Sequence, residues 1–136
     1  MRILAIDYGT KKCGLAVTDP LQLIATPLET VPTHRLLDWL ADYLGREEVS
    51  DVVIGEPLTA EGAYNPVQAE IVGFERKIAE LYPRIGLHRQ DEFRTSVRAR
   101  QSMLDMGMKK KRRRDKTEVD RLAAAIILQD FLEERR

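Results

Sequence analysis

The stretch RILAIDYGTKKCGLAVT, residues 2–18, decides the fold. Its first part, Arg2 to Asp7, is a nearly continuous apolar run of the kind found in strands buried on both faces. After the turn Tyr8 to Lys12, the run Cys13 to Thr18 follows closely enough to pair with the first strand as a hairpin. Asp7 closes a buried strand, where an unpaired carboxylate is costly unless a cation or hydrogen-bond donors meet it.

The rest of the chain alternates between strand patterns and helix patterns. Strands are expected over residues 24–29, 51–55 and 85–90, and Pro27 restricts the first of these to an edge or an end of the sheet. Helices are expected over residues 33–47 with Thr33 as N-cap, from Asn65-Pro66 to Leu81, over 95–106 and over 117–133. Their predicted core residues include Leu36, Leu37, Trp39, Leu40 and Leu44 in the first helix, and Val67, Ile71, Phe74, Ile78 and Leu81 in the second.

This order predicts an α/β fold in which a mixed five-stranded sheet carries helices on both faces and its first three strands form an antiparallel meander. The length suits a single domain over residues 1–136. A composition of 43% hydrophobic and 32% charged residues is that of a globular protein. Cys13 is the one cysteine, and no apolar run approaches the roughly 18 residues of a membrane span. We therefore expect a cytoplasmic protein that does not bind membranes.

Acidic residues stand where the predicted strands end. Asp7 ends the first strand, Glu56 follows the fourth and Glu92 follows the fifth, and ligands of such sheets gather beyond the carboxyl ends of the strands. Asp120, on the last helix, shares the spacing of an apolar stripe that contains Ala123 and Ala124. The alternative to a functional role is that the acids at the strand ends are solvated turn residues. For Asp120 it is a first-turn acid that the helix dipole stabilises.

Carboxylates that converge in this way repel one another unless a divalent ion neutralises them. Mg²⁺ takes such hard oxygen ligands and keeps water and phosphate in the rest of its shell. Paired ions can activate a water and stabilise the leaving oxygen of a phosphodiester. The pattern therefore indicates a nuclease site that uses Mg²⁺ or Mn²⁺.

A net charge of zero hides a basic segment. Residues 93–116 contain ten Lys or Arg against two Asp, and residues 109–116 carry seven positive charges in eight positions. Such a block repels itself unless an anion is at hand, and nucleic acid is the obvious one, although a solvated loop is the alternative. No aromatic residue is interleaved, so backbone contacts are expected in place of base stacking. The candidate nucleic-acid-binding residues are Lys109, Lys110, Lys111, Arg112, Arg113, Arg114 and Lys116, with Arg94, Arg98, Lys11 and Lys12.

The motif IDYGTKKCGLAVTD, residues 6–19, resembles the opening motif of the YqgF/RuvX family, RNase H-like relatives of bacterial Holliday junction resolvases. VIGEPL at 53–58, DEFRTS at 91–96 and the helix from Lys116 to Ala124 are similar to its later motifs, so the resemblance spans the chain in order. It implies an RNase H-like fold and a metal-assisted phosphodiesterase with Asp7, Glu92 and Asp120 as catalytic acids. It also implies action at the 5′ end of pre-16S ribosomal RNA or, by an older assignment, on Holliday junctions.

The sequence departs from the family pattern at two positions. Phe93 stands directly after the Asp-Glu pair, where the family usually has Arg, and Arg94 follows one place later. Glu56 occupies a position where many members carry an apolar residue. It is either an auxiliary metal ligand or a loop acid.

Three hypotheses follow. The first is a metal-dependent endonuclease of the two-metal-ion type, a monomer or weak homodimer, with structured RNA favoured and branched DNA as the alternative substrate. The second is a non-catalytic RNA-binding factor in ribosome assembly, which the Phe93 departure favours. The third is an ATP-binding protein of the actin and sugar-kinase superfamily, whose first phosphate motif residues 7–10 also resemble. Such proteins clamp nucleotide between two domains and this chain supplies one, so we expect no nucleotide binding.

Overall fold

A computed structural model describes residues 1–56, 67–91 and 116–135. The strands are β1 (Arg2–Asp7), β2 (Lys12–Thr18), β3 (Ala25–Pro32), β4 (Val49–Glu56) and β5 (Gly86–Asp91). The helices are α1 (Leu36–Arg46), preceded by a 3₁₀ turn (Thr33–Arg35), α2 (Val67–Leu81) and α5 (Lys116–Arg135). None of these helices is long and apolar enough to cross a membrane.

The five strands form one mixed sheet in the order β3-β2-β1-β4-β5. β2 pairs antiparallel with both β1 and β3, whereas β4 pairs parallel with both β1 and β5. The predicted antiparallel meander is confirmed, and β3, which contains Pro27 and Pro32, is an edge strand as a proline-bearing strand should be.

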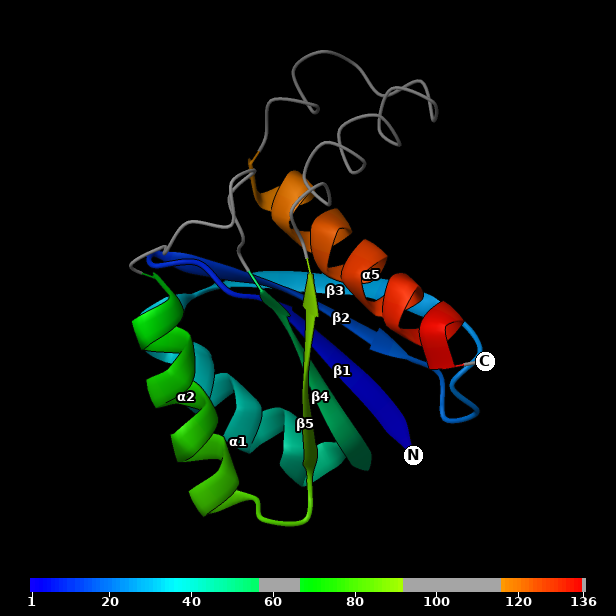
Figure 1. The fold of residues 1–136 in the computed structure, drawn as a ribbon, viewed down its shortest axis with the longest axis horizontal. Coiled ribbons are helices and arrows are strands. Elements are labelled where there is room, and N and C mark those ends of the chain that lie inside the picture. Colours follow the sequence, from blue (N-terminus) through cyan, green and yellow to red (C-terminus); the bar gives the residue numbers. More distant parts are fainter. Residues whose placement is uncertain (57–66, 92–115, 136) are drawn as a thin grey trace.

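The central strand β1 is covered on both faces, which explains its continuous apolar sequence. Ile3, Leu4, Ala5 and Ile6 expose no surface. On one face Leu4 and Ile6 pack in a cluster with residues of α1 and α2. On the other face Ile3 and Ala5 pack in a second cluster with α5, so the sheet lies between helices (Figure 1).

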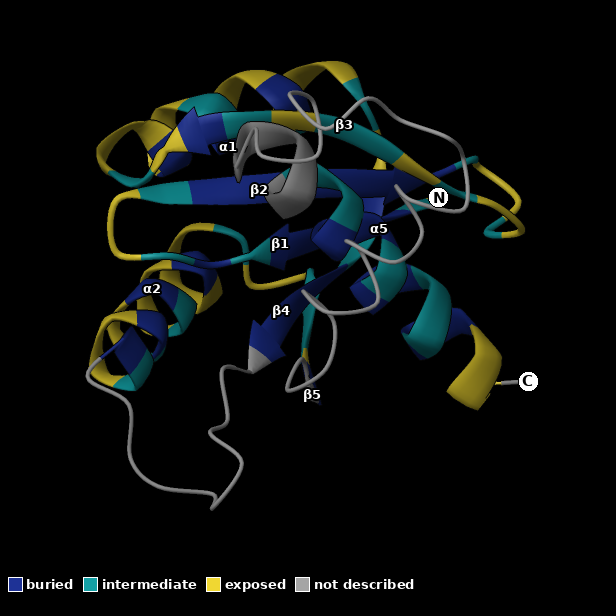
Figure 2. Ribbon diagram, turned by 90° about the horizontal axis from the view of Figure 1, so that it is seen from above, coloured by how far each residue is buried: buried dark blue, intermediate teal, exposed yellow. Residues whose placement is uncertain are grey.

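Small residues let α5 lie close to the sheet. Ala123 and Ala124 are buried, and Ala124 belongs to the same cluster as Ala5 of β1 and Ala16 of β2. The burial colouring of Figure 2 shows the inner side of α5 as buried where it crosses the sheet. The apolar stripe predicted to contain Ala123 and Ala124 therefore faces the sheet.

Several local predictions need correction. Thr33 does not cap a helix through its side chain, since it lies in the 3₁₀ turn and α1 begins at Leu36. Leu37 and Leu81 were predicted to be core residues but are 37% and 49% exposed. Leu36 and Leu40 are buried as expected, and Trp39 packs at the edge of the core, where it stacks on Tyr43. The predicted helix over 95–106 and the Asn65-Pro66 start of α2 lie outside the described residues.

Candidate active site

The carboxyl ends of the three parallel strands, β1, β4 and β5, lie at the same edge of the sheet. Asp7, the last residue of β1, is half-buried and pairs with Gly14 of β2. The parallel register aligns Ile6 with Ile54, so the next position of β4 lies beside Asp7. β4 ends at Glu56, which aligns with Asp91 of β5. The backbone thus brings together the strand ends that the sequence predicted would carry acids.

The structure says less about the other predicted acids. Glu56 is the last residue of β4 and Asp120 lies in the second turn of α5, but their side chains lie outside the described part. Glu92 is outside the described residues altogether, as are Arg94, Arg98 and the basic residues 109–114. Lys116 is the first residue of α5, and its side chain is likewise not described.

The backbone of α5 nevertheless places position 120 toward the Asp7 end of the sheet. Ala124 packs in one cluster with Ala5 and Ala16, which pair with each other. Figure 1 shows α5 and β1 running in opposite directions. Position 120 lies four residues before Ala124, about 6 Å back along the helix. Asp7 lies two residues after Ala5, about 7 Å forward along the strand, and therefore in the same direction. That step leads to the pair of Asp7 and Gly14.

The turn that follows Asp7 is held by hydrogen bonds from a distant part of the chain. The Thr33 hydroxyl donates to the carbonyl oxygen of Gly9 at 2.7 Å, and the Thr33 amide donates to the carbonyl oxygen of Lys11 at 2.9 Å. The buried Cys13 thiol lies 3.4 Å from the same hydroxyl. A Cβ at Gly9 would lie 2.5 Å from the Lys12 carbonyl oxygen, so this turn requires glycine. Thr33 therefore stabilises the turn next to Asp7, a role that the residues around Thr33 in the sequence do not predict.

Tyr8 anchors the same turn in the core. Its ring packs against Phe74 of α2 with centroids 5.6 Å apart, and the residue is only 9% exposed. Burial raises the pKa of Tyr8 to about 12, with further contributions from the nearby Cys13 thiol and the Glu70 carboxylate. Tyr8 is therefore a neutral structural residue at physiological pH, next in sequence to a carboxylate.

Lys11 and Lys12, two of the predicted nucleic-acid contacts, flank this turn. Lys11 is exposed and Lys12 is the half-buried first residue of β2. Both lie at the Asp7 end of the sheet, as a substrate-contacting role requires. Within the described ranges, no group of three or more His, Cys, Asp or Glu side chains is placed to hold a metal ion. The donor set available at the strand ends is nevertheless one of carboxylate oxygens, which suits Mg²⁺ or Mn²⁺.

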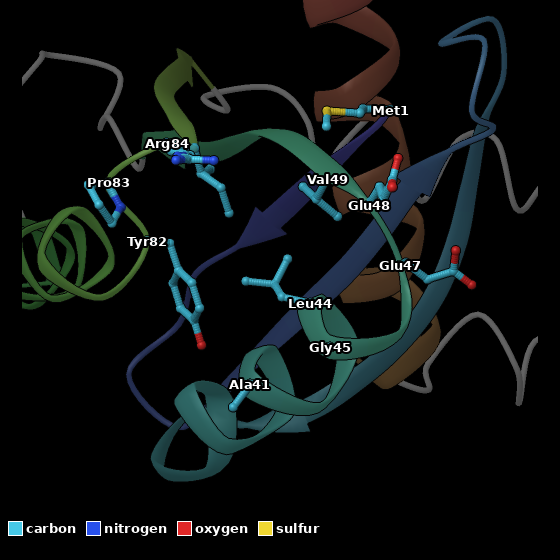
Figure 3. Close-up of a pocket in the computed structure, with 11 residues that line it drawn as sticks. Met1, Ala41, Leu44, Gly45, Glu47, Glu48, Val49, Tyr82, Pro83 and Arg84 are labelled. Atoms are coloured by element: carbon cyan, nitrogen blue, oxygen red, sulfur yellow. The ribbon is translucent and has the colours of Figure 1, made fainter.

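A hollow of about 550 Å³ lies at the opposite end of the molecule. Figure 3 shows Leu44 and Val49 around it, with Tyr82 and Arg84 from the connection between α2 and β5. It is mainly apolar, and Glu47 and Glu48 are the acids among its lining residues. None of the predicted site residues lines it, so it is not the candidate active site.

Comparisons with known proteins identify the family of this chain. The model of the family RuvX, described as Holliday junction resolvase, matches residues 1–134. A protein of Flavobacterium johnsoniae named "Putative pre-16S rRNA nuclease" is 45% identical over 135 residues, which cover 99% of this chain and 98% of that protein. Proteins of the same name from Phocaeicola vulgatus and Porphyromonas gingivalis are 46% and 47% identical, covering 99% and 97% of this chain and 97% and 96% of theirs.

A solved structure shares the fold. It is titled "T. thermophilus RuvC in complex with Holliday junction substrate", and it superposes with a TM-score of 0.60 at 19% identity, covering 99% of this chain and 95% of the other. The RNase H-like architecture predicted from the sequence is thereby confirmed.

Proposed function

Because the chain belongs to the RuvX family, we propose that it is a nuclease that hydrolyses phosphodiester bonds with the help of divalent metal ions and matures the 5′ end of pre-16S ribosomal RNA. The supporting relatives are more than 40% identical over nearly their whole length. The observation that carries the proposal is the position of Asp7, half-buried on the central strand where the ends of β1, β4 and β5 meet.

We assign Asp7, Glu92 and Asp120 as the acids that hold the metal ions, with Glu56 as an auxiliary acid at the end of β4. Bound Mg²⁺ or Mn²⁺ would supply an activated water and a counter-charge for the leaving oxygen. The hydrogen bonds from Thr33 to Gly9 and Lys11 hold the turn after Asp7, which supports a fixed position for the backbone that carries this acid. The basic residues from 109 to 116 position the phosphate chain without reading its sequence.

The Asp7→Asn variant tests the proposal. Asparagine keeps the size of the side chain but removes the negative charge that the metal ions need. We expect cleavage of a precursor 16S rRNA fragment to fall by more than the roughly 10–100-fold that loss of an outer-shell partner costs. The melting temperature of the variant should stay close to that of the wild type, because asparagine keeps the size and the hydrogen-bonding oxygen of the side chain. Undiminished cleavage by Asp7→Asn would sink the proposal.

Resolution of four-way DNA junctions is the second candidate, since it is the activity by which the matching family is described. One assay separates the two: precursor 16S rRNA and a four-way junction are offered side by side with Mg²⁺ and with Mn²⁺. Metal-dependent cleavage of the RNA alone supports the first assignment. Symmetric nicking of the junction alone supports the second, and tight binding with no turnover under either ion would instead identify a non-catalytic RNA-binding factor.

A further inference from the structure

Two segments far apart in the sequence lie side by side at the Asp7 end of the sheet. The turn between β1 and β2 is tied to the 3₁₀ turn by the hydrogen bond from the Thr33 amide to the Lys11 carbonyl oxygen, 2.9 Å long. The register of β2 and β3 aligns Lys12 with Pro32, the residue that precedes this 3₁₀ turn. In Figure 1 the turn after β1 lies beside the start of α1.

This contact gathers four basic residues, Lys11, Lys12, His34 and Arg35, which we call the turn patch. Lys11, His34 and Arg35 are exposed, and Lys12 is half-buried. Within the part of the chain that the structure describes, none of the four side chains makes an ion pair or a hydrogen bond.

Three arginines elsewhere in the described residues form ion pairs, whereas Lys77 and Arg84 form none there. Arg2 pairs with Glu47, Arg46 with Asp42 and Arg89 with Glu75. Near the turn patch, Glu29 accepts a hydrogen bond from the Trp39 indole, and Asp38, one turn along α1, makes no ion pair with described residues. Lys11, Lys12 and Arg35 of the turn patch thus carry positive charges that form no ion pair with described residues.

The turn patch is close enough to Asp7 to act on the same substrate. Asp7 pairs with Gly14, and Lys12 stands two residues before Gly14 in β2, about 7 Å along the strand. Residues two apart in a strand share a face, and paired residues of neighbouring strands share it too. Lys12 and Asp7 therefore lie on the same face of the sheet.

We propose that Lys11, Lys12, His34 and Arg35 form a phosphate-binding surface that holds the nucleic-acid backbone on the β3 side of Asp7. A polyanion supplies ion-pair partners that these side chains lack among the described residues, and each phosphate neutralised releases bound counterions. The hydrogen bonds of Thr33 to Gly9 and Lys11 fix the backbone of the two turns relative to each other, so the side chains of the patch are held near one another before the substrate binds. The inference rests on the proposed nuclease function and names a second substrate contact besides residues 109–116.

Binding of a fluorescent RNA stem–loop tests the surface apart from cleavage. The double variant Lys11→Ala/Arg35→Ala is compared with Lys77→Ala/Arg84→Ala, which removes two exposed positive charges from α2 and from the turn after it. Both are made in the full chain with Asp7→Asn and titrated without divalent ions over about 50–200 mM salt.

In the patch variant the slope of log K against log salt should become shallower by about 0.7–0.9 for each phosphate that the protein no longer neutralises, and affinity should fall. The matched control should keep the slope of the parent. Both doubles should melt like the parent because the altered side chains are exposed. Equal slopes and equal affinities in the two doubles would overturn the inference, and so would the absence of RNA binding by the parent.

Cleavage assays of the same two double variants, made in a chain that keeps Asp7, distinguish the nuclease proposal from the binding-surface proposal. A patch variant with raised KM and unchanged kcat supports a positioning surface. If the wild type binds RNA through the patch but never cleaves it, the nuclease assignment fails and the binding surface stands. If it cleaves with a KM that the patch double leaves unchanged, the surface fails and the nuclease assignment stands.

Discussion

The hydroxyl of Thr33 donates a hydrogen bond to the carbonyl oxygen of Gly9, 2.7 Å away and 24 residues earlier in the chain. This bond joins the start of the α1 region to the turn that follows Asp7. The Cys13 thiol lies beside it, 3.4 Å from the hydroxyl and 3.9 Å from the same carbonyl oxygen. The turn after Asp7 therefore depends on a residue far from it in the sequence, and changes at Thr33 or Gly9 should affect stability and activity together.

Replacement of Thr33 by valine tests this bond, since valine keeps the volume and removes the donor. We expect the free energy of unfolding to fall by about 0.5–1.5 kcal/mol, the usual net value of such a hydrogen bond, and cleavage to fall with it. Urea denaturation measures the change. Thr33→Ser is the matched control, because it retains the hydroxyl, and it should keep most of the activity. Equal activity losses in the two variants would mean that the hydroxyl is not what orders the turn.

Gly9→Ala should destabilise the protein, because the added Cβ would lie 2.5 Å from the Lys12 carbonyl oxygen and the turn would have to move. We expect a loss of about 1–3 kcal/mol, as for other overpacked positions. Gly73→Ala in α2 is the control, since nothing lies within 4 Å of its Cβ position. That change should stabilise the protein by about 0.5–1 kcal/mol, as alanine does in a helix. Thermal and urea unfolding of both variants check the opposite signs.

Ala124→Leu tests the close packing of α5 against the sheet. Ala124 has no exposed surface and packs in one cluster with Ala5 and Ala16, so a larger side chain must push the helix from the sheet. We expect a loss of about 1–3 kcal/mol in unfolding free energy. Because the same helix carries Asp120, cleavage should fall further than the loss of folded protein explains. Ala79→Leu, on the exposed side of α2, should stay within about 0.5 kcal/mol of the wild type.

Asp51 gives the protein a predictable acid sensitivity. Burial acts to raise the pKa of its carboxyl, but hydrogen bonds from Ser50, 2.6 Å, and His88, 2.8 Å, outweigh it and leave the pKa below its ordinary value. A carboxyl whose pKa is lower in the folded state stabilises the fold above its unfolded pKa, about 3.9. That stabilisation is lost as pH falls through the lower, folded pKa.

Unfolding free energies measured by urea between pH 7 and pH 3 test this account. The wild type should lose stability below about pH 4 more steeply than Asp51→Asn, because the variant has no proton to take up at this position. Asp42→Asn is the control, since Asp42 forms an ion pair with Arg46 in which both side chains are more than half exposed. Parallel pH profiles for the wild type and Asp51→Asn would contradict the assignment.

Strand predictions succeeded where the signal lies within the strand itself. β1 spans the predicted residues Arg2 to Asp7, because a strand covered on both faces must be apolar throughout. The two overpredicted core residues show the limit of this reasoning. Helical periodicity defines an apolar stripe, but the helices do not bury its full width, and Leu37 and Leu81 lie on the solvent side.

The catalytic roles of Asp7, Glu92 and Asp120 stay predictions, whereas the strand ends that carry Asp7 and Glu56 lie where the sequence predicted them. Acids at the ends of strands follow from the positions of Asp7 and Glu56 in the sequence, and the parallel register explains why those ends meet. The role of Thr33 was predicted wrongly: its hydroxyl bonds to Gly9 and caps no helix. A helix cap is predicted from the few residues that follow it. The acceptor of the Thr33 hydroxyl is instead the carbonyl oxygen of Gly9, which lies in a distant part of the sequence.

By itself, then, the sequence of this protein determined the kind and order of the strands and helices that the structure describes, and the acids at the ends of β1 and β4. These are local properties, carried by apolar periodicity and by turn residues. Only the tertiary structure decided which distant residues adjoin, such as Thr33 with Gly9, Asp51 with His88, and the 3₁₀ turn with Lys11. Such contacts depend on the register of the strands and on the position at which each helix packs against the sheet. Both are determined by the packing of the whole chain.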